Sequence, residues 1–190
     1  WSSPGEMKFL DLIDPKISFD FLGGMFLSVF RKSLWDQNIE VLDRNAIHDS
    51  RTFSHFDNTF PHVKIFACAF SDSRAYFNDK PMNVCLTGAR EWSPMYPFIR
   101  SVRLVEALDE YRRNGLPFFQ YIYCKNFALS NFMSDFAFMF LTRKISGYRY
   151  LDPPSLIAGY SIYPNFYLSF IYFIARRACR VLHPLRFFII

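Results

Sequence analysis

One stretch constrains the fold of this 190-residue chain more than any other: twenty consecutive residues, 156–175, carry no charge. An apolar run of this length would just cross a bilayer. Pro164-Asn165 in its middle and its many tyrosines instead favour a helix that lies at a membrane surface or packs against protein. Arg176-Arg177 follow at once, which is typical of binding to anionic lipid. We therefore expect surface association, with a spanning helix and a packed helix hairpin as alternatives.

The composition indicates a folded chain with a large core. Of its residues 51% are hydrophobic and 20% aromatic, which excludes a disordered or collagen-like chain, and the length fits one domain or a piece of one. The net charge of +5 is mild, and the basic residues form no patch interleaved with aromatics, so we expect no nucleic-acid partner. The four cysteines have neither CxxC nor zinc-site spacing and are expected to be reduced core thiols.

Two helices are predicted from their start signals. Pro61 at a first-turn position predicts a helix over 61–70, capped by Thr59. Ser93-Pro94 predicts a longer helix that ends at Gly115. Its apolar stripe would be Met95, Phe98, Val102, Val105 and Leu108, and its solvent face Arg103, Glu106, Glu110 and Arg113.

The remaining segments give a third helix, short strands and a loop. An aromatic helix is predicted over 118–143. The charged residues inside it, Lys125 and Asp135, are predicted to face solvent and not to pair with each other. A short strand is predicted within residues 1–20, and a hairpin or two short strands within 74–87. Residues 36–59 are polar and are predicted to form a loop.

Motifs that would identify an enzyme by themselves are absent from the sequence. It has no GxSxG, no HExxH, no glycine-rich phosphate loop and no GxGxxG. Asp-x-Asp, the usual anchor for a divalent metal on a nucleotide diphosphate, is also absent. Asp11 and Asp14 have the wrong spacing for it. No residue of this chain is therefore predicted to bind a metal.

The functional prediction depends on three segments in a fixed order. Gly23-Gly24 come first, before a basic and aromatic stretch; residues 56–62 and then 88–92 follow at intervals of about thirty residues. In this order they resemble the acceptor-side half of family 2 glycosyltransferases, which have the GT-A fold. The closest likeness is to the O-antigen and capsule sugar transferases of bacteria. The resemblance covers about residues 15–115.

The resemblance implies an α/β fold: the C-terminal portion of a GT-A-like domain over 1–115, followed by an aromatic helical, membrane-associating region over 116–190. It implies transfer of a sugar from a nucleotide-sugar donor to a lipid-linked saccharide acceptor, by a protein bound peripherally to the cytoplasmic face of the cell membrane. A divalent metal, Mg or Mn, is expected in the full-length enzyme. Because the chain begins at Trp1 and the donor-binding half is not in it, we expect a fragment that is inactive alone.

The resemblance also assigns substrate-binding residues. Gly23 and Gly24 would let the backbone approach the sugar closely, since glycine has no side chain in the way. Arg90 would hold the leaving diphosphate through its two-pronged guanidinium, and Trp92 would stack on the apolar face of a sugar. The structural alternatives are a plain turn for the glycines, a solvated arginine, and a tryptophan that covers the core.

A general base is expected near the start of the helix over 61–70. The family's usual pair of acidic residues is missing there, where residues 58–62 read NTFPH. We expect His62 to take the acceptor hydroxyl proton, because an imidazole titrates near neutral pH and the helix N-terminus keeps it uncharged. Asp57 is the second candidate, and a purely structural role is the alternative for His62. The alternative function for the chain is a non-catalytic, membrane-associated interaction protein.

Overall fold

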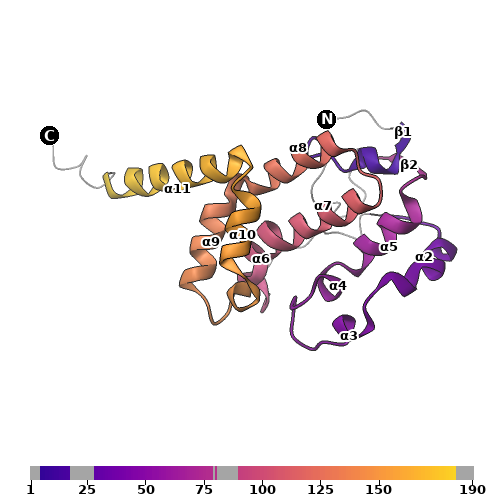
Figure 1. Cartoon of the computed structure of the whole chain (residues 1–190), viewed down its shortest axis with the longest axis horizontal. Helices are drawn as coiled ribbons and strands as arrows, with labels where there is room; N and C mark the ends of the chain where they lie inside the picture. Colours follow the sequence, from indigo (N-terminus) through magenta and orange to yellow (C-terminus); the bar gives the residue numbers. More distant parts are fainter. Residues whose placement is uncertain (1–4, 18–27, 79, 81–89, 183–190) are drawn as a thin grey trace.

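The computed structural model of the chain describes residues 5–17, 28–78, 80 and 90–182. Within these residues the protein is mostly helical, with one two-stranded antiparallel sheet (Figure 1). Helices and strands are both present, as the α/β prediction requires, but helices dominate. A GT-A domain has a larger sheet than the described residues contain, so that finer expectation stays a prediction.

The sheet joins two segments that are far apart in the sequence. Strands β1 (Gly5–Lys8) and β2 (Arg74–Phe77) run antiparallel, with Glu6 opposite Tyr76. The strand predicted near the N-terminus is confirmed. A strand after residue 73 is also confirmed, but its partner is β1. The second strand of a local hairpin would fall within residues 79–87, most of which lie outside the described residues.

The segment predicted as a loop, 36–59, contains helices. Helix α2 (Lys32–Asn38) runs into a 3₁₀ turn (Ile39–Val41), and α3 (Arg44–Ile47) and α4 (Phe56–Thr59) follow. Asp43 explains α3, because its carboxylate accepts hydrogen bonds from the backbone N–H groups of Asn45 and Ala46, at 2.9 and 3.4 Å. The loop prediction was wrong because the polar residue that caps a helix also resembles a turn former.

Helix α5 (Pro61–Phe70) has the bounds that the sequence predicts. Proline stands at its first position, where the missing N–H costs no intrahelical hydrogen bond. Thr59 does not cap it: Phe60 holds the cap position, without a side-chain hydrogen bond. The buried side of α5 includes Val63 and Phe66 and packs between α2 and the later helix α7 (Leu104–Arg113).

Residues 93–113 form one composite helical run. A 3₁₀ turn (Ser93–Met95) leads into α6 (Tyr96–Phe98), a π-helical segment (Ile99–Arg103) and α7. All five residues of the predicted apolar stripe are buried, and Gly115 follows at φ +103°, the left-handed conformation that suits glycine after a helix. Arg103 differs from its prediction on the solvent face: it is 7% exposed, because a π-helical turn rotates the faces of the helix.

The helix predicted over 118–143 is two helices, α8 (Phe118–Ala128) and α9 (Phe132–Leu141), separated by a 3₁₀ turn. Lys125 and Asp135 do not face solvent as predicted, since they are 9% and 3% exposed. The Lys125 ammonium lies 2.7 Å from a carboxylate oxygen of Asp109 on α7. Asp135 pairs with Arg100 of the π-helical segment. Both charges are thus satisfied by another helix, and a pattern within one helix does not reveal such partners.

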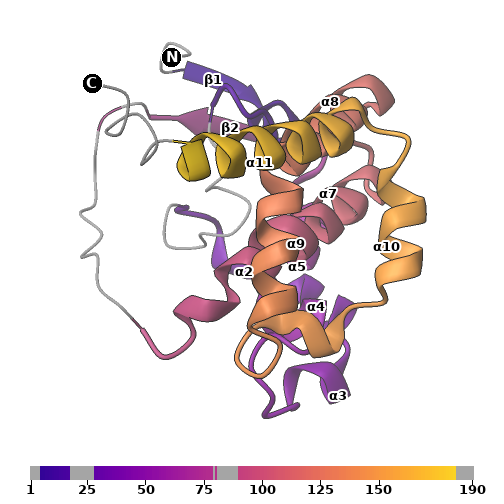
Figure 2. The same cartoon turned by 90° about the vertical axis from the view of Figure 1, so that its left-hand side faces the viewer.

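The uncharged run forms parts of two helices, α10 (Pro153–Tyr160) and α11 (Pro164–Leu182), with a short turn before Pro164. Figure 2 shows α11 lying across the end of α9, and Figure 1 shows it running on beyond the other helices. Among the described residues, none of the helices combines the length and the apolar character needed to traverse a bilayer.

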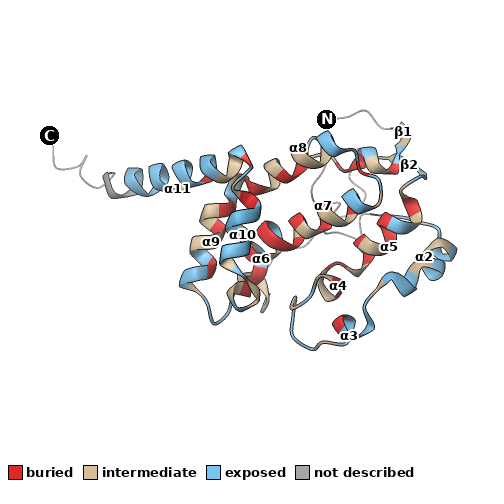
Figure 3. Cartoon of the chain, viewed as in Figure 1, coloured by how far each residue is buried: buried red, intermediate tan, exposed pale blue. Residues whose placement is uncertain are grey.

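The described residues form three hydrophobic clusters in the core. The largest joins the 3₁₀ turn after β1 with α5, α7 and α8; the second joins α7, α9 and the turn between α10 and α11; the third joins α6 to α9. Figure 3 shows the buried residues gathered along α5 and α7. Cys124 is buried as predicted, whereas Cys68 and Cys179 are exposed. Cys85 lies outside the described residues.

Candidate functional site

Asp57, on α4, is a buried carboxylate whose two oxygens are both engaged. It is 3% exposed. The Lys64 ammonium lies 2.6 Å from Oδ1 and donates to Oδ2 at 2.8 Å, and the backbone N–H of Asp43 donates to Oδ2 at 2.7 Å. The carboxylate therefore ties the start of α3 to α4 and α5. These contacts occupy three of the about four acceptor positions of the carboxylate.

His62, the second residue of α5, lies in aromatic surroundings. It is 5% exposed. The rings of Phe60 and Phe66 stand nearly perpendicular to the imidazole, with centroids 5.9 and 5.7 Å away. Phe66 belongs to the largest hydrophobic cluster, so the imidazole borders the core. Only a substrate bound directly against the start of α5 could reach it.

Arg90 and Trp92 lie just before the composite helix and contact each other. The Arg90 guanidinium is exposed and stands 5.4 Å from the centroid of the Trp92 ring, within the range of a cation–π interaction. The Trp92 ring also contacts Tyr96, at 4.8 Å, and Phe53, at 5.7 Å between centroids. We call Phe53, Trp92 and Tyr96 the aromatic platform. Tyr96 is 54% exposed, so part of the platform is open to solvent.

Phe53 brings the platform next to the segment that leads into α4. It has φ +58°, a left-handed conformation that is rare for an aromatic residue and carries strain. The guanidinium of Arg103 holds this conformation, because it donates to the carbonyl oxygens of Phe53 and Ser54 at 3.0 and 2.7 Å. The same guanidinium pairs with Glu106, at 2.6 Å. A buried arginine therefore fixes the loop four residues before Asp57.

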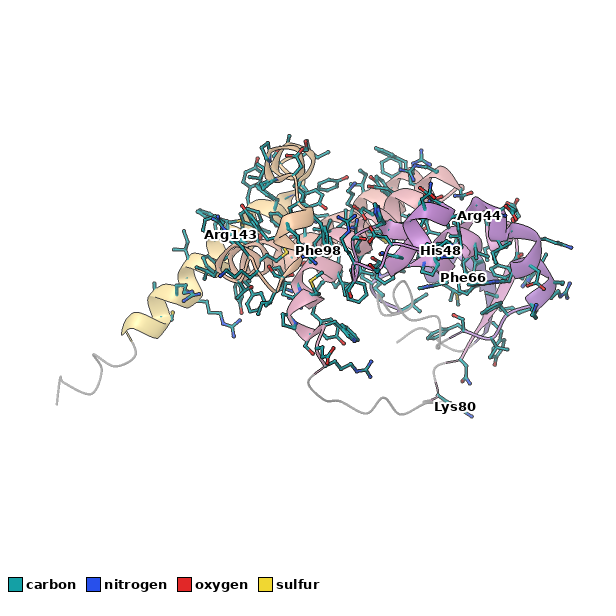
Figure 4. All side chains as sticks on the ribbon, turned by 90° about the horizontal axis from the view of Figure 1, so that it is seen from below. Arg44, His48, Phe66, Lys80, Phe98 and Arg143 are labelled. Atoms are coloured by element: carbon teal, nitrogen blue, oxygen red, sulfur yellow. The ribbon has the colours of Figure 1, made fainter. Side chains whose placement is uncertain are left out.

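The Arg90–Trp92 turn thus contacts the loop that leads into α4, three residues before the predicted segment 56–62. Trp92 contacts Phe53, which precedes Asp57 and His62 in the same short stretch of chain. The ring of His62 itself is turned toward Phe66. The Arg103 guanidinium lies over the Phe98 ring. Figure 4 shows Phe98 at a distance from Phe66, the residue beside His62. Gly23 and Gly24 lie outside the described residues.

The same loop holds an imidazole–carboxylate pair that was not predicted from the sequence. His55 Nε2 lies 2.9 Å from Asp49 Oδ2, and the Arg51 guanidinium donates to that oxygen at 2.6 Å. Hydrogen bonds from Arg51 hold the pKa of Asp49 far below its usual range. His55 is exposed, and a carboxylate that orients an imidazole is the arrangement found around many general bases. Asp49, Arg51 and His55 are close together in the sequence. They lie in a segment that was predicted as a loop, so no helical or strand periodicity indicated that their side chains would meet.

In the part of the chain that the structure describes, the residues that could hold a metal are dispersed. Among the described residues, no three His, Cys, Asp or Glu side chains are grouped as metal ligands. The Mg or Mn that the resemblance implies does not fit this part of the chain, and no chemical step is derived through it.

Comparison of the chain with protein-family models, with curated proteins and with solved structures gives no match. The resemblance to family 2 glycosyltransferases therefore rests on the three sequence segments alone and stays a prediction.

Proposed function

We propose that the chain is the acceptor-side portion of a glycosyltransferase that moves a sugar from a nucleotide sugar to a lipid-linked saccharide. The acceptor hydroxyl oxygen would attack the anomeric carbon of the donor while its proton passes to a base. The bond from that carbon to the diphosphate would break, and the nucleoside diphosphate would leave. Donor and metal would be held by an upstream half, which the resemblance implies.

The contact between Phe53 and Trp92 is the observation on which the proposal chiefly depends. It joins the loop that leads into α4, three residues before the predicted segment 56–62, to the Arg90–Trp92 turn, which the same resemblance selected. An exposed aromatic surface can pack on the apolar face of a sugar ring, and the platform is such a surface. Arg90, beside it, has the charge and geometry to bind a diphosphate.

The contacts of Asp57 and His62 suggest different roles for the two residues. The Asp57 carboxylate is engaged by Lys64 and by the backbone of Asp43, so we assign it to positioning the start of α5. The imidazole of His62 keeps the role of general base in the proposal. This requires the acceptor to lie against the start of α5, within hydrogen-bond reach of the ring.

The assignment of His62 is tested by kinetics of the full-length gene product. Transfer would be followed by mass spectrometry with a panel of nucleotide sugars and lipid-linked saccharides. His62→Ala should lower kcat by roughly 10²–10⁴ if the imidazole is the base. His62→Gln, which fills more of the buried space, should lose as much, and His48→Ala, at an exposed histidine, should lose nothing. Unchanged turnover in both His62 variants would remove this assignment.

The role of the platform is tested separately in the same assay. Trp92→Ala should raise KM for the acceptor by about two- to tenfold, because stacking on an aromatic face contributes about 0.5–1.5 kcal/mol. Tyr76→Ala, at an exposed tyrosine on β2, is the control and should leave KM unchanged. An equal KM in the two variants would argue against sugar binding at the platform.

A non-catalytic interaction protein at a membrane is the second candidate function. The observation in its favour is that both residues chosen as bases are buried and in contact with protein groups, whereas α11 exposes many apolar side chains. The two functions differ in one result: the interaction protein would show no transfer with any donor and acceptor of the panel.

A further inference from the structure

Helix α11 presents apolar side chains on the side that faces away from the protein. Tyr167, Ile171 and Ile174 follow at steps of four and three, so they share one face of the helix. They are 54%, 61% and 50% exposed, and Leu168, at 56%, lies beside them. Figure 3 shows the helix exposed along most of its length. A helix on a water-facing surface normally has polar residues on this side.

The opposite face of α11 already has its partners within the protein. The Asn165 backbone N–H donates to Asn126 Oδ1 at 2.8 Å, and the hydroxyl of Ser169 accepts from the backbone N–H of Met133 at 3.3 Å. The Phe166 ring lies 5.5 Å from Phe132 between centroids. The exposed apolar face is therefore additional to the one that the fold uses, and Figure 1 shows that the C-terminal part of the helix extends past the body.

An apolar hollow continues this face toward the body. It has a volume of about 280 Å³ and lies among α9, α10 and α11. Its lining is aromatic and aliphatic: Phe132, Met133, Phe136, Ile157, Phe166, Tyr167 and Phe170. Tyr167 belongs both to the hollow and to the outward face, so the two form one continuous apolar surface.

The charges on α11 favour an anionic partner. The helix contains no acidic residue. Arg176 and Arg177 are exposed near its C-terminal end, and the Arg177 guanidinium stands 5.5 Å from the Phe173 ring. An apolar face with tyrosines, flanked by arginines and free of acidic residues, is the composition of helices that lie in the interface of anionic bilayers.

We propose that α11 docks in the plane of an anionic phospholipid surface, with Tyr167, Ile171 and Ile174 in the acyl boundary and Arg176 and Arg177 at the phosphates. Lipid acyl chains would fill the hollow behind Tyr167. This inference rests on the proposed function in one respect: docking at the membrane would explain how the protein reaches a lipid-linked acceptor. Binding to lipid can be measured without donor or acceptor, so either proposal can fail alone.

Flotation of the full chain with vesicles tests the docking surface. Vesicles of phosphatidylcholine with about one third phosphatidylglycerol should carry the protein, and phosphatidylcholine alone should carry much less. Binding should weaken between about 0.1 M and 0.5 M salt, since salt screens the arginines. Ile171→Glu with Ile174→Glu should reduce binding at least tenfold. Ile39→Glu with Ile47→Glu, at exposed isoleucines (46% and 39%) near α2 and in α3, is the matched control and should bind normally.

The contribution of charge has its own pair of variants. Arg176→Gln with Arg177→Gln should reduce binding to the anionic vesicles about tenfold or more. Arg44→Gln with Arg74→Gln removes the same charge at exposed positions elsewhere and should change binding little. Absence of binding by the unaltered protein, or equal binding by all variants, would overturn the proposal. So would a stable dimer, measured by sedimentation, that the Ile171 and Ile174 substitutions dissociate, because a second copy would then cover this face.

Discussion

At the scale of single residues, the buried charges of the apolar helices have specific partners on other elements. Asp135 accepts hydrogen bonds from Arg100 and from the Ser101 hydroxyl, and it is 3% exposed. Lys125 reaches both Asp109 and the hydroxyl of Tyr121, at 2.7 and 2.8 Å. A buried carboxylate or ammonium without such partners would be strongly destabilising, so these contacts fix how the helices meet.

Asp135→Asn should lower the free energy of unfolding by about 1–3 kcal/mol, because a neutral amide cannot replace the charge-assisted hydrogen bonds from Arg100 and Ser101. The midpoint of urea denaturation measures the change. Asp36→Asn is the control, since Asp36 and its partner Lys32 are both exposed and such pairs contribute below about 0.5 kcal/mol. Equal midpoints for the two variants would show that the Asp135 contacts contribute nothing beyond a surface pair.

At the scale of elements, the composite helix over 93–113 packs through a close approach of backbone to ring. Gly147 begins a 3₁₀ turn (Gly147–Tyr150) that lies against Phe98 of α6. A Cβ at position 147 would lie 2.2 Å from the Phe98 ring, which is fully buried and cannot move freely. Position 147 therefore has no room for a side chain, because α6 and the turn after α9 are in contact there.

Gly147→Ala should destabilise the protein by about 1–3 kcal/mol, because the added methyl overpacks a buried contact. Gly159→Ala is the matched substitution: it lies in α10, nothing stands within 4 Å of its new Cβ, and alanine is the better helix former. We expect it to stabilise by up to about 1 kcal/mol. Thermal unfolding followed by circular dichroism should give shifts of opposite sign, and a shared sign would contradict this account of Gly147.

At the scale of the whole molecule, the first two hydrophobic clusters bury tyrosines, which makes stability sensitive to alkali. Burial raises the pKa of Tyr121 and of Tyr163 to about 12, and it also raises the pKa values of Tyr111 and Tyr160. Burial likewise raises the pKa of the Cys124 thiol to about 12. In the unfolded chain a tyrosine has a pKa of about 10. The folded state therefore holds these protons more tightly than the unfolded state does.

The sign of the pH dependence follows from this difference. The stabilisation is fully present below about pH 10 and is lost as pH rises through the folded-state pKa values near 12. We expect the midpoint of urea denaturation to fall between about pH 9.5 and pH 11.5. Tyr111→Phe should make the fall smaller, whereas Tyr76→Phe, at an exposed tyrosine, should not. A midpoint that stays constant over this range would contradict the burial of the tyrosines.

Local signals were enough for part of the fold. The proline at the start of α5 and the stripe from Met95 to Leu108 were readable, because helix starts and amphipathic faces depend on residues close in sequence. The resemblance, rather than these local signals, selected Arg90 and Trp92, and the Trp92 ring contacts Phe53. The His55–Asp49 pair was missed because neither residue stands at a spacing that a regular element would bring together.

The sequence by itself determined that the chain has a large aromatic core, that helices occupy 61–70 and much of 93–113, and that an uncharged segment precedes a basic one. Only the tertiary structure decided which polar residues are buried, since Arg103, Lys125 and Asp135 are stabilised by partners on other elements. It also decided the pairing of β1 with β2 and the break between α8 and α9. Partners distant in the sequence leave no periodic trace in it, because local propensity and spacing report only on neighbours along the chain.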